Sequence, residues 1–338
     1  MHRPLHDALQ ARRATRCAVP ILLTVGMPLA AGAWLAMTAA AVALDLERHA
    51  DRVAIVDDAG RTAAVFTFGD RLVGRPAIRD LHTPGGVMVT RPCPIRPGID
   101  PDDHATLHPG VMLCFSDLSG ADPWRHKTAV RFGGFRQDPA LDQGRVGFTF
   151  AADYLAEPED TPSARVVCRE ESTITIADRS IAGTPVRIVT WDARLAAGDQ
   201  PVTFADVEEM GFGIRLIREL SPKWGGCYRA AHGGRDERGV FGTQAAWCDA
   251  SGEVGGTRVG VTLVDRGFQT QPAYFHARDY GWLLANPFGR RSYTKGDSAA
   301  VTVSPGESLE LHYGLVLHDD VADDLLPGIV ASAWAAPE

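Results

Sequence analysis

Two histidines stand in a short segment whose residue types suit acid/base or metal chemistry. His104 and His108 follow Asp103 in the segment 102–110, which ends just before the apolar run Val111–Leu113. An imidazole changes charge near neutral pH, and a neighbouring carboxylate can orient it for proton transfer. Loops on rigid β scaffolds often carry functional sites, so we treat this segment as a candidate site. The structural alternative is that both histidines only cap turns.

A second group of polar residues lies in the segment Tyr274–Gly281. In an extended chain His276, Arg278 and Tyr280 point to one face, because successive side chains of a strand alternate between faces. The planar fork of Arg278 can bind a carboxylate or hydroxyl groups, and Asp279 can pair with an arginine. We therefore expect these side chains to line a cleft. A surface strand with a structural ion pair is the alternative.

Other charged groups give weaker signals. The glycine-flanked loop 231–239 is most simply a solvated connection. Glu170 and Glu171 are adjacent, as are Glu208 and Glu209, so the members of each pair would face opposite sides of a strand. Neither pair alone therefore predicts the paired carboxylates of a glycosidase.

Several catalytic signatures are absent from the sequence. It contains no G-x-S-x-G, P-loop, H-E-x-x-H or dinucleotide-binding glycine motif. No Glu-x-x-His spacing occurs either, which excludes the di-iron carboxylate site of helical bundles. The formal net charge of −8 argues against a nucleic-acid partner, because such proteins present a basic face.

The elements that must position these residues are short strands. The chain has 338 residues, 45% of them hydrophobic, and its 35 glycines and 22 prolines make it dense in turns. We expect a hairpin of residues 53–56 and 64–68 and further strands at 86–90, 111–115, 145–154, 164–176, 185–191, 211–217, 242–247, 258–264, 300–303 and 308–317, with a turn at 249–252. Such a pattern predicts an all-β protein, a sandwich or barrel, with one domain over 45–320. We expect residues 321–338 to form a C-terminal tail with a short helix, and the best helix candidates lie near 320–326 and 328–334.

The N-terminal segment 1–43 has the order of an export signal. Residues 1–16 are basic, residues 17–44 carry no charge, and Ala41-Val42-Ala43 offers a cleavage site. We expect an exported protein, and the alternatives are a structured N-terminal strand, a mis-assigned start with a cytoplasmic protein, or an uncleaved anchor. No later stretch is long and apolar enough to span a membrane. The six cysteines form no C-x-x-C motif, so we expect single buried thiols, with disulfides only after export.

Several blocks between about residues 51 and 320 are distinctive as a set. The most specific is His276-Ala277-Arg278-Asp279-Tyr280-Gly281, followed by Ala285-Asn286-Pro287-Phe288-Gly289. The others are Arg75-Pro76, His82-Thr83-Pro84-Gly85-Gly86, Thr90-Arg91, Asp103-His104, His108-Pro109-Gly110, Asp117–Asp122, Trp124, Gly211–Arg215 and Ala246–Asp249. This set resembles a bacterial family labelled methane oxygenase PmoA-like, which is distinct from the helical membrane subunit of particulate methane oxygenase.

The resemblance implies a large antiparallel β-sandwich like the galactose-mutarotase supersandwich, with few short helices and an association with carbohydrate use. On this basis we expect the protein to bind or process a sugar or a related small polar substrate. His108 and His276 would share acid/base catalysis, and Arg278 would orient the substrate. The substrate would also contact four other residues, which are Asp103, His104, Trp124 and Tyr280. An epimerase, lyase or hydrolase fits this chemistry.

Two other functions stay open. A metal-dependent oxygenase, as the family label says, would use His104, His108 and His276 to hold a divalent metal. However, many relatives carry a His-His-Arg/Lys-Gly-like cluster where this chain reads Leu107-His108-Pro109-Gly110, so we assign no metal from the sequence. The third function is a non-catalytic carbohydrate-binding or scaffold module. The sequence does not decide the substrate, the cofactor or the oligomeric state.

Overall fold

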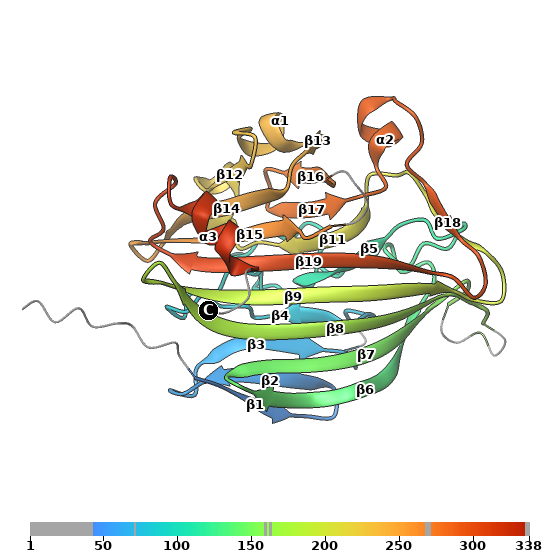
Figure 1. Ribbon diagram of the computed structural model, residues 1–338, viewed down its shortest axis with the longest axis horizontal. Coiled ribbons are helices and arrows are strands. Elements are labelled where there is room, and N and C mark those ends of the chain that lie inside the picture. The colour runs from blue at the N-terminus through green and yellow to red at the C-terminus, as the bar shows by residue number, and fades with distance from the viewer. Residues whose placement is uncertain (1–42, 71, 159–160, 162–163, 268–271, 335–338) are drawn as a thin grey trace, which may run out of the picture. The chain divides into compact units, whose positions relative to one another are not determined.

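The computed structural model describes residues 43–334 apart from 71, 159–160, 162–163 and 268–271. The expected export signal falls almost wholly outside these residues. Two large antiparallel sheets lie face to face (Figure 1). The first has nine strands in the order β1-β2-β3-β4-β5-β11-β17-β16-β13. Their bounds are β1 Leu44–Arg48, β2 Arg52–Asp57, β3 Thr62–Thr67, β4 Ala77–Arg79, β5 Val111–Phe115, β11 Met210–Arg215, β17 Trp282–Asn286, β16 Tyr274–Arg278 and β13 Thr243–Gln244.

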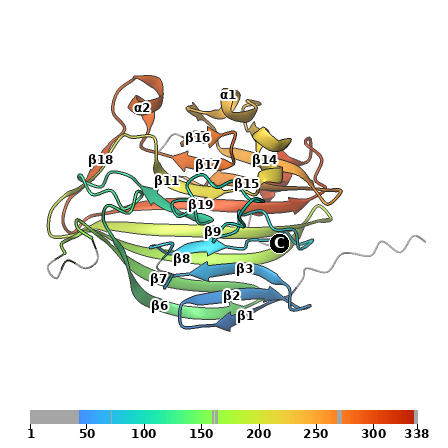
Figure 2. The same cartoon turned by 180° about the vertical axis from the view of Figure 1, so that it is seen from behind.

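The second sheet has eight strands in the order β12-β14-β15-β19-β9-β8-β7-β6. It lies nearer the viewer in Figure 1, and the nine-stranded sheet is nearer in Figure 2. The bounds are β12 Cys227–Ala230, β14 Trp247–Val254, β15 Thr257–Asp265, β19 Ser308–Asp319, β9 Thr184–Ala197, β8 Val166–Ile181, β7 Arg145–Leu155 and β6 Val130–Asp142. A small two-stranded sheet pairs β10 (Val202–Phe204) with β18 (Val301–Val303).

The main hydrophobic core lies between the two sheets. Strands of both sheets alternate, so that one side chain enters this core and the next points outward. In β5, for example, Leu113 belongs to the core between the sheets, whereas Met112 and Cys114 belong to a separate cluster on the outer face of the nine-stranded sheet. The outer face of the eight-stranded sheet carries a third cluster, which α3 (Leu326–Ala333) covers.

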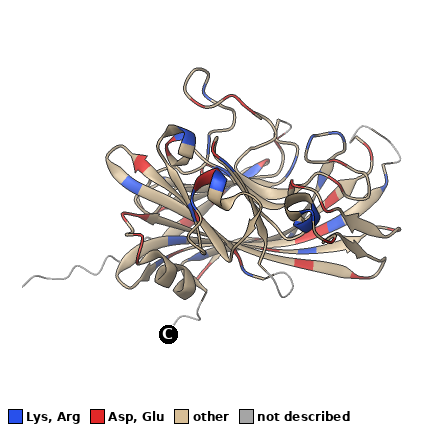
Figure 3. Cartoon of the chain, turned by 90° about the horizontal axis from the view of Figure 1, so that it is seen from above, with Lys and Arg blue, Asp and Glu red and all other residues tan. Residues whose placement is uncertain are grey.

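The all-β antiparallel sandwich predicted from the sequence is confirmed. Helices are few and short among the described residues: α1 (Asp236–Val240), α2 (Arg290–Thr294), α3, and the 3-10 turns η1 (Arg218–Leu220) and η2 (Pro222–Trp224). No helix in this part of the chain is long and apolar enough to cross a membrane. Basic and acidic residues are interspersed over the strands and loops (Figure 3). The five described cysteines are free thiols.

Some element predictions were wrong. Residues 86–90 form no strand and only isolated bridges, since Met88 pairs with His82 and Thr90 with Leu216. The expected turn 249–252 lies inside β14, and the hairpin turns instead at Gly255-Gly256. Strand β6 was not predicted. The helix near 328–334 is present as α3, whereas no helix forms over 320–325. The division of the chain at residues 45 and 320 stays a prediction.

Candidate functional site

The candidate site lies on the outer face of the nine-stranded sheet, over β5, β11 and β17. Arg215 of β11 is opposite Trp282 of β17 in the ladder. The indole of Trp282 lies directly over Gly213, where even a Cβ would collide with the ring. A glycine at this position therefore lets a large aromatic side chain lie flat on the strands. Trp282 and the loop residue Trp124 are both almost fully buried there, with their rings 5.3 Å apart.

The histidine segment is fixed in place by one buried arginine. The guanidinium of Arg91 donates hydrogen bonds to the carbonyl oxygens of Pro101 (2.9 Å), Asp103 (2.7 Å) and His104 (3.1 Å). A longer bond of 3.4 Å reaches the carbonyl of His108. Arg91 is only 1% exposed, and burial together with the charge of Arg215 lowers its pKa to about 10. One side chain thus satisfies the carbonyl groups of a loop that has no sheet partner.

The same segment joins β5 through a glycine. Gly110 has φ of +139°, and a Cβ at this position would run into the carbonyl oxygen of Ile78 on β4. Only glycine adopts this conformation without strain. The carbonyl of Gly110 also accepts a hydrogen bond of 2.8 Å from the backbone of Arg215. The loop carrying the histidines therefore enters the sheet in one fixed direction.

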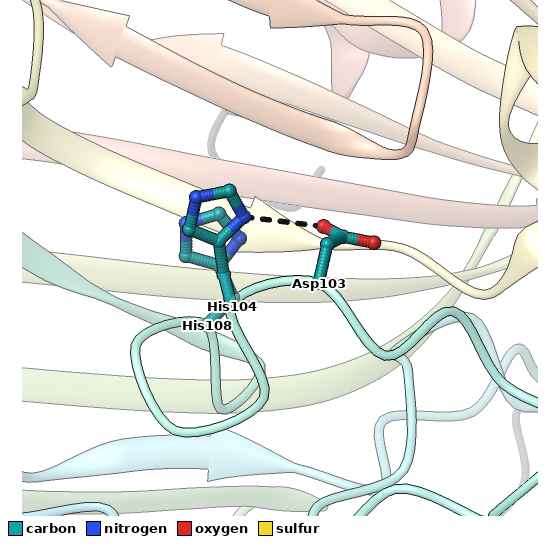
Figure 4. Close-up of side chains that lie close together, drawn as sticks. All are labelled: Asp103, His104 and His108. Carbon is teal, nitrogen blue, oxygen red and sulfur yellow. Dashed lines mark hydrogen bonds and ion pairs between the residues drawn. The ribbon is translucent and has the colours of Figure 1, made fainter.

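His104 and Asp103 form an accessible pair. The Nδ1 atom of His104 lies 3.2 Å from Oδ2 of Asp103 (Figure 4). The other oxygen, Oδ1 of Asp103, accepts a bond of 2.9 Å from Arg215. The imidazole of His104 is 45% exposed, whereas Arg215 is fully buried. Burial acts to raise the pKa of Asp103, but the charge and hydrogen bond of Arg215 and the bond to His104 lower that pKa overall. Asp103 is therefore an anion that orients His104.

His108 lies beneath His104 in a stack of parallel rings. Its ring centroid is 4.8 Å from that of His104, 4.2 Å from that of Trp282 and 5.0 Å from that of Trp124. The residue is 2% exposed, and its Nδ1 atom has no hydrogen-bond partner. Burial, followed by the charges of Arg215 and His104, holds the pKa of His108 well below its ordinary value. This imidazole is neutral at physiological pH.

Tyr280 connects the histidine segment to the second predicted group. Its ring stacks at 5.7 Å on His104, and the guanidinium of Arg215 lies 4.8 Å from the ring centre. Burial is the main cause that raises the pKa of Tyr280; the charges of Arg215 and Arg278 oppose that rise, and those of Asp103 and Glu209 add to it. Both cationic and anionic side chains therefore act on the hydroxyl group of Tyr280. It follows β16 in a turn and is not part of the strand itself.

The second group forms a network around Arg278. Its guanidinium donates to Glu237 at 3.0 Å, to Glu208 at 3.4 Å and, through Nε, to Nε2 of His276 at 3.2 Å. His276 is 3% exposed, and burial, together with the charge of Arg278, lowers its pKa to about 3. The carboxylate of Asp279 accepts a bond of 2.9 Å from the backbone N–H of Glu237, and no arginine among the described residues pairs with it. The expected arginine partner for Asp279 was wrong, because reciprocal backbone bonds with Glu237 occupy it.

Only part of the predicted metal set comes together. Asp103, His104 and His108 place one ligand atom each within 4.8 Å of one another, and His276 is not in this group. The two imidazole rings are tilted by only 13°, one in front of the other (Figure 4). A nitrogen lone pair points outward in the plane of its ring, so two such rings cannot both direct lone pairs at one ion about 2.0–2.1 Å away. The arrangement as it stands does not fit a shared metal.

The structure thus brings together five of the predicted residues, which are Asp103, His104, His108, Trp124 and Tyr280. The other two, His276 and Arg278, lie on the neighbouring strand β16, which leads into the turn of Tyr280. The roles assigned to these residues stay predictions. Sequence reasoning missed the importance of Arg91 and Arg215, whose burial no local pattern reveals. It also set aside Glu208 and Glu237, which both pair with Arg278. The charge of the loop around Glu237 was the only feature of the sequence that pointed to these partners of Arg278.

Comparisons with solved structures find distant similarity. The chain is similar to a GH36 alpha-galactosidase, AgaA, from Geobacillus stearothermophilus, solved with raffinose, at 10% identity and a TM-score of 0.41. The match covers 82% of this chain but only 40% of the alpha-galactosidase. It is also similar to a galactose mutarotase related enzyme from Lactobacillus acidophilus, at 9% identity and a TM-score of 0.35, over 81% of this chain and 97% of that one. A galactose mutarotase-like protein from Clostridium acetobutylicum matches at 8% identity with a TM-score of 0.35, over 83% and 99% of the two chains.

Sequence comparison corrects the expected family. The search among curated proteins found no match. No PmoA-like family model matches, so the methane oxygenase label was wrong. The model that does match is that of a family of unknown function, DUF6807, and it covers residues 56–327. Since this is most of the chain, the protein belongs to the DUF6807 family.

Proposed function

We propose that this protein binds a carbohydrate or a related small polar molecule on the outer face of the nine-stranded sheet and that His104 exchanges a proton with it. One observation carries the proposal. His104 is the exposed residue of a ring stack in which His108, Trp124 and Trp282 are buried, and Asp103 holds its Nδ1 atom. A carboxylate that accepts from Nδ1 leaves Nε2 of the neutral ring as a base.

The rigidity of the pair supports this role. Asp103 is itself held by Arg215, and the backbone of both residues of the pair is held by Arg91. Acid/base groups act efficiently when the fold fixes their positions before the substrate arrives. The site therefore requires little rearrangement for His104 to meet a bound hydroxyl group.

The surroundings suit a polyhydroxylated ligand. Tyr280 is half-buried beside His104, and the guanidinium of Arg215 lies 4.8 Å from its ring centre. Two residues earlier in the chain, Arg278 pairs with Glu208 and Glu237. Sugar hydroxyl groups both donate and accept hydrogen bonds, so they can pair with cations and carboxylates alike. Trp124 was expected to contact the substrate, but its ring is covered by His108 and 2% exposed. Tyr280 is the accessible aromatic group.

A non-catalytic binding module is the second candidate. His108 and His276, the residues expected to share catalysis, are both buried and have lowered pKa values. Arg278 is already engaged by two carboxylates. If His104 does not transfer a proton, the same face still presents Tyr280 and charged groups to a ligand.

The test begins with a thermal-shift screen of the full chain against mono- and disaccharides, followed by product analysis for each sugar that stabilises it. We expect His104→Ala and Asp103→Asn to lower turnover of such a sugar by about 10²–10⁴-fold, the usual contribution of general acid/base catalysis. His312→Ala is the matched control, because His312 also pairs its Nδ1 atom with an aspartate, Asp192 at 2.8 Å, but lies on the other sheet. Its turnover should equal that of the wild type.

Two results would contradict the proposal in different ways. Sugar binding without any product, and weakened by His104→Ala, supports the binding module and excludes the proton transfer. Turnover that survives His104→Ala within a few-fold places the chemistry elsewhere.

A further inference from the structure

A cavity of about 160 Å³ lies on the outer face of the eight-stranded sheet, away from the candidate site. Its floor is formed by β8 and β9, where Thr175 and Thr190 are paired in the ladder. The end of α3 and the following Trp334 form one wall. An apolar cavity of about 150 Å³ holds a benzene molecule, so this volume suits a ligand of a few heavy atoms.

Three arginines from separate parts of the fold line this cavity. Arg145 begins β7, Arg179 lies near the end of β8, and Arg266 follows β15. No carboxylate lines it in the part of the chain that the structure describes. The cavity therefore concentrates positive charge in a chain whose net charge is −8.

The nearby acids neutralise this charge only in part. Arg266 pairs with Asp192 at 2.9 Å, and Arg145 reaches Asp142 at 3.7 Å with both side chains at least half exposed. The polar contact of Arg179 is a long bond of 3.5 Å to the carbonyl of Ala333. A guanidinium group has five N–H donors, so Arg179 retains donors that a ligand can engage.

The other polar groups of the cavity are also donors. The hydroxyl groups of Thr175 and Thr190 bond each other at 2.7 Å, and the one that accepts keeps its own proton for a further partner. The indole Nε1 of Trp334 is buried and has no acceptor. Arg266 lies 4.9 Å over the Trp334 ring, which holds that guanidinium beside the cavity. Buried donors without acceptors favour an incoming acceptor group.

We propose that this cavity binds the oxyanion group of a small ligand: a phosphate, sulfate or carboxylate. Arg145 and Arg179 supply charge-assisted hydrogen bonds, and arginine forks match the geometry of such groups. One hydroxyl of the Thr175–Thr190 pair and the indole of Trp334 complete the set of donors. This site is separate from the proposed sugar site, since the two lie on the outer faces of different sheets.

The experiment is calorimetric titration of the full chain with inorganic phosphate, at an ionic strength held constant with sodium chloride. We expect saturable binding that weakens at least 10-fold in Arg179→Gln and in Arg145→Gln. Arg145 is half exposed, so its replacement should not impair folding. Arg169→Gln is the matched control, because Arg169 lies on β8 as Arg179 does, is half exposed as Arg145 is, and does not line the cavity. His104→Ala should bind phosphate as the wild type does.

Parallel titrations with sulfate and acetate identify the preferred oxyanion, a tetrahedral group or a carboxylate. The proposal is overturned if none of the three anions binds saturably. It is equally overturned if Arg169→Gln weakens binding as much as Arg179→Gln, because the effect would then be one of general surface charge. Loss of phosphate binding in His104→Ala would place the anion at the other face instead.

Discussion

At the scale of single residues, burial separates three histidines that look alike in the sequence. His104 is exposed, whereas His108 and His276 are almost fully buried and have lowered pKa values. A buried imidazole that no carboxylate hydrogen-bonds favours its neutral form, because the charged form loses its hydration. The residue type alone therefore could not tell which histidine reaches a substrate.

The lowered pKa of His276 predicts how stability depends on pH. In the unfolded chain this histidine takes up a proton near its ordinary pKa of about 6.5, whereas the folded protein resists protonation until about pH 3. Between these values the unfolded state binds more protons, so the free energy of unfolding falls as pH falls, by about 1.4 kcal/mol per pH unit from this residue. The titratable and charged groups that face His276 are Arg278, Glu208 and Tyr293.

His276→Gln isolates this contribution, since glutamine keeps an acceptor for Arg278 but does not titrate. We expect urea unfolding at pH 7, 6 and 5 to show a steeper loss of stability in the wild type than in the variant. Other titrating groups, His108 included, affect both proteins equally. Parallel curves for the two proteins would contradict the lowered pKa, because they would mean that His276 takes up its proton at the same pH in the folded and unfolded states.

At the scale of elements, the sequence predicts strands well where hydrophobic alternation is regular. Strand β5 and the hairpin of β2 and β3 lie where the pattern places them. Strand β6 was missed because it contains Gly133, Gly134 and Pro139 and is interrupted by register shifts. An edge strand tolerates such residues, which break the local pattern. The polar run 249–252 continues as a strand because His318 and Thr262 of neighbouring strands satisfy Asp249.

The shape of the loop carrying the histidines is not predicted by any local pattern, and its stability should depend on Arg91. Lysine in place of Arg91 keeps the charge but loses the planar fork that reaches several carbonyl groups. We expect Arg91→Lys to lower the free energy of unfolding by about 1–3 kcal/mol, the cost of leaving buried polar groups unpaired. It should also weaken binding of any sugar found in the screen. Urea unfolding and titration with that sugar measure both effects.

Arg218→Lys is the control for this substitution, because the side chain of Arg218 is 46% exposed and pairs at 3.5 Å with Glu219, which is 41% exposed. Its stability should change by less than about 1 kcal/mol, as expected for surface ion pairs. An Arg91→Lys protein as stable as the wild type would show that the loop holds its shape without the guanidinium.

At the scale of the whole described chain, one core connects two faces that differ in chemistry. The nine-stranded sheet presents the histidine pair outward, and the eight-stranded sheet presents the arginine-lined cavity outward. The alternation of side chains, which the sequence does reveal, fixes which residues fill the core between them. Which polar residues meet on each outer face depends on strand order: β11 lies next to β5 and β17, and both of these strands are far from it in the sequence. That long-range order was beyond the reach of local patterns.

This shared core predicts that the two sheets unfold together. Phe212 of β11 stacks at 4.9 Å on Tyr313 of β19 and meets Trp191 of β9 edge to face at 5.6 Å, so its ring bridges the sheets. We expect Phe212→Ala to cost about 3–5 kcal/mol, as buried phenylalanine truncations do. The urea midpoint should fall with an unchanged slope, and tryptophan fluorescence and far-UV circular dichroism should report one transition. Leu325→Ala is the control, because this side chain is exposed and should leave the midpoint unchanged. Two separated transitions in Phe212→Ala would instead mean that one sheet stays folded without the other, and that each outer face is stabilised independently.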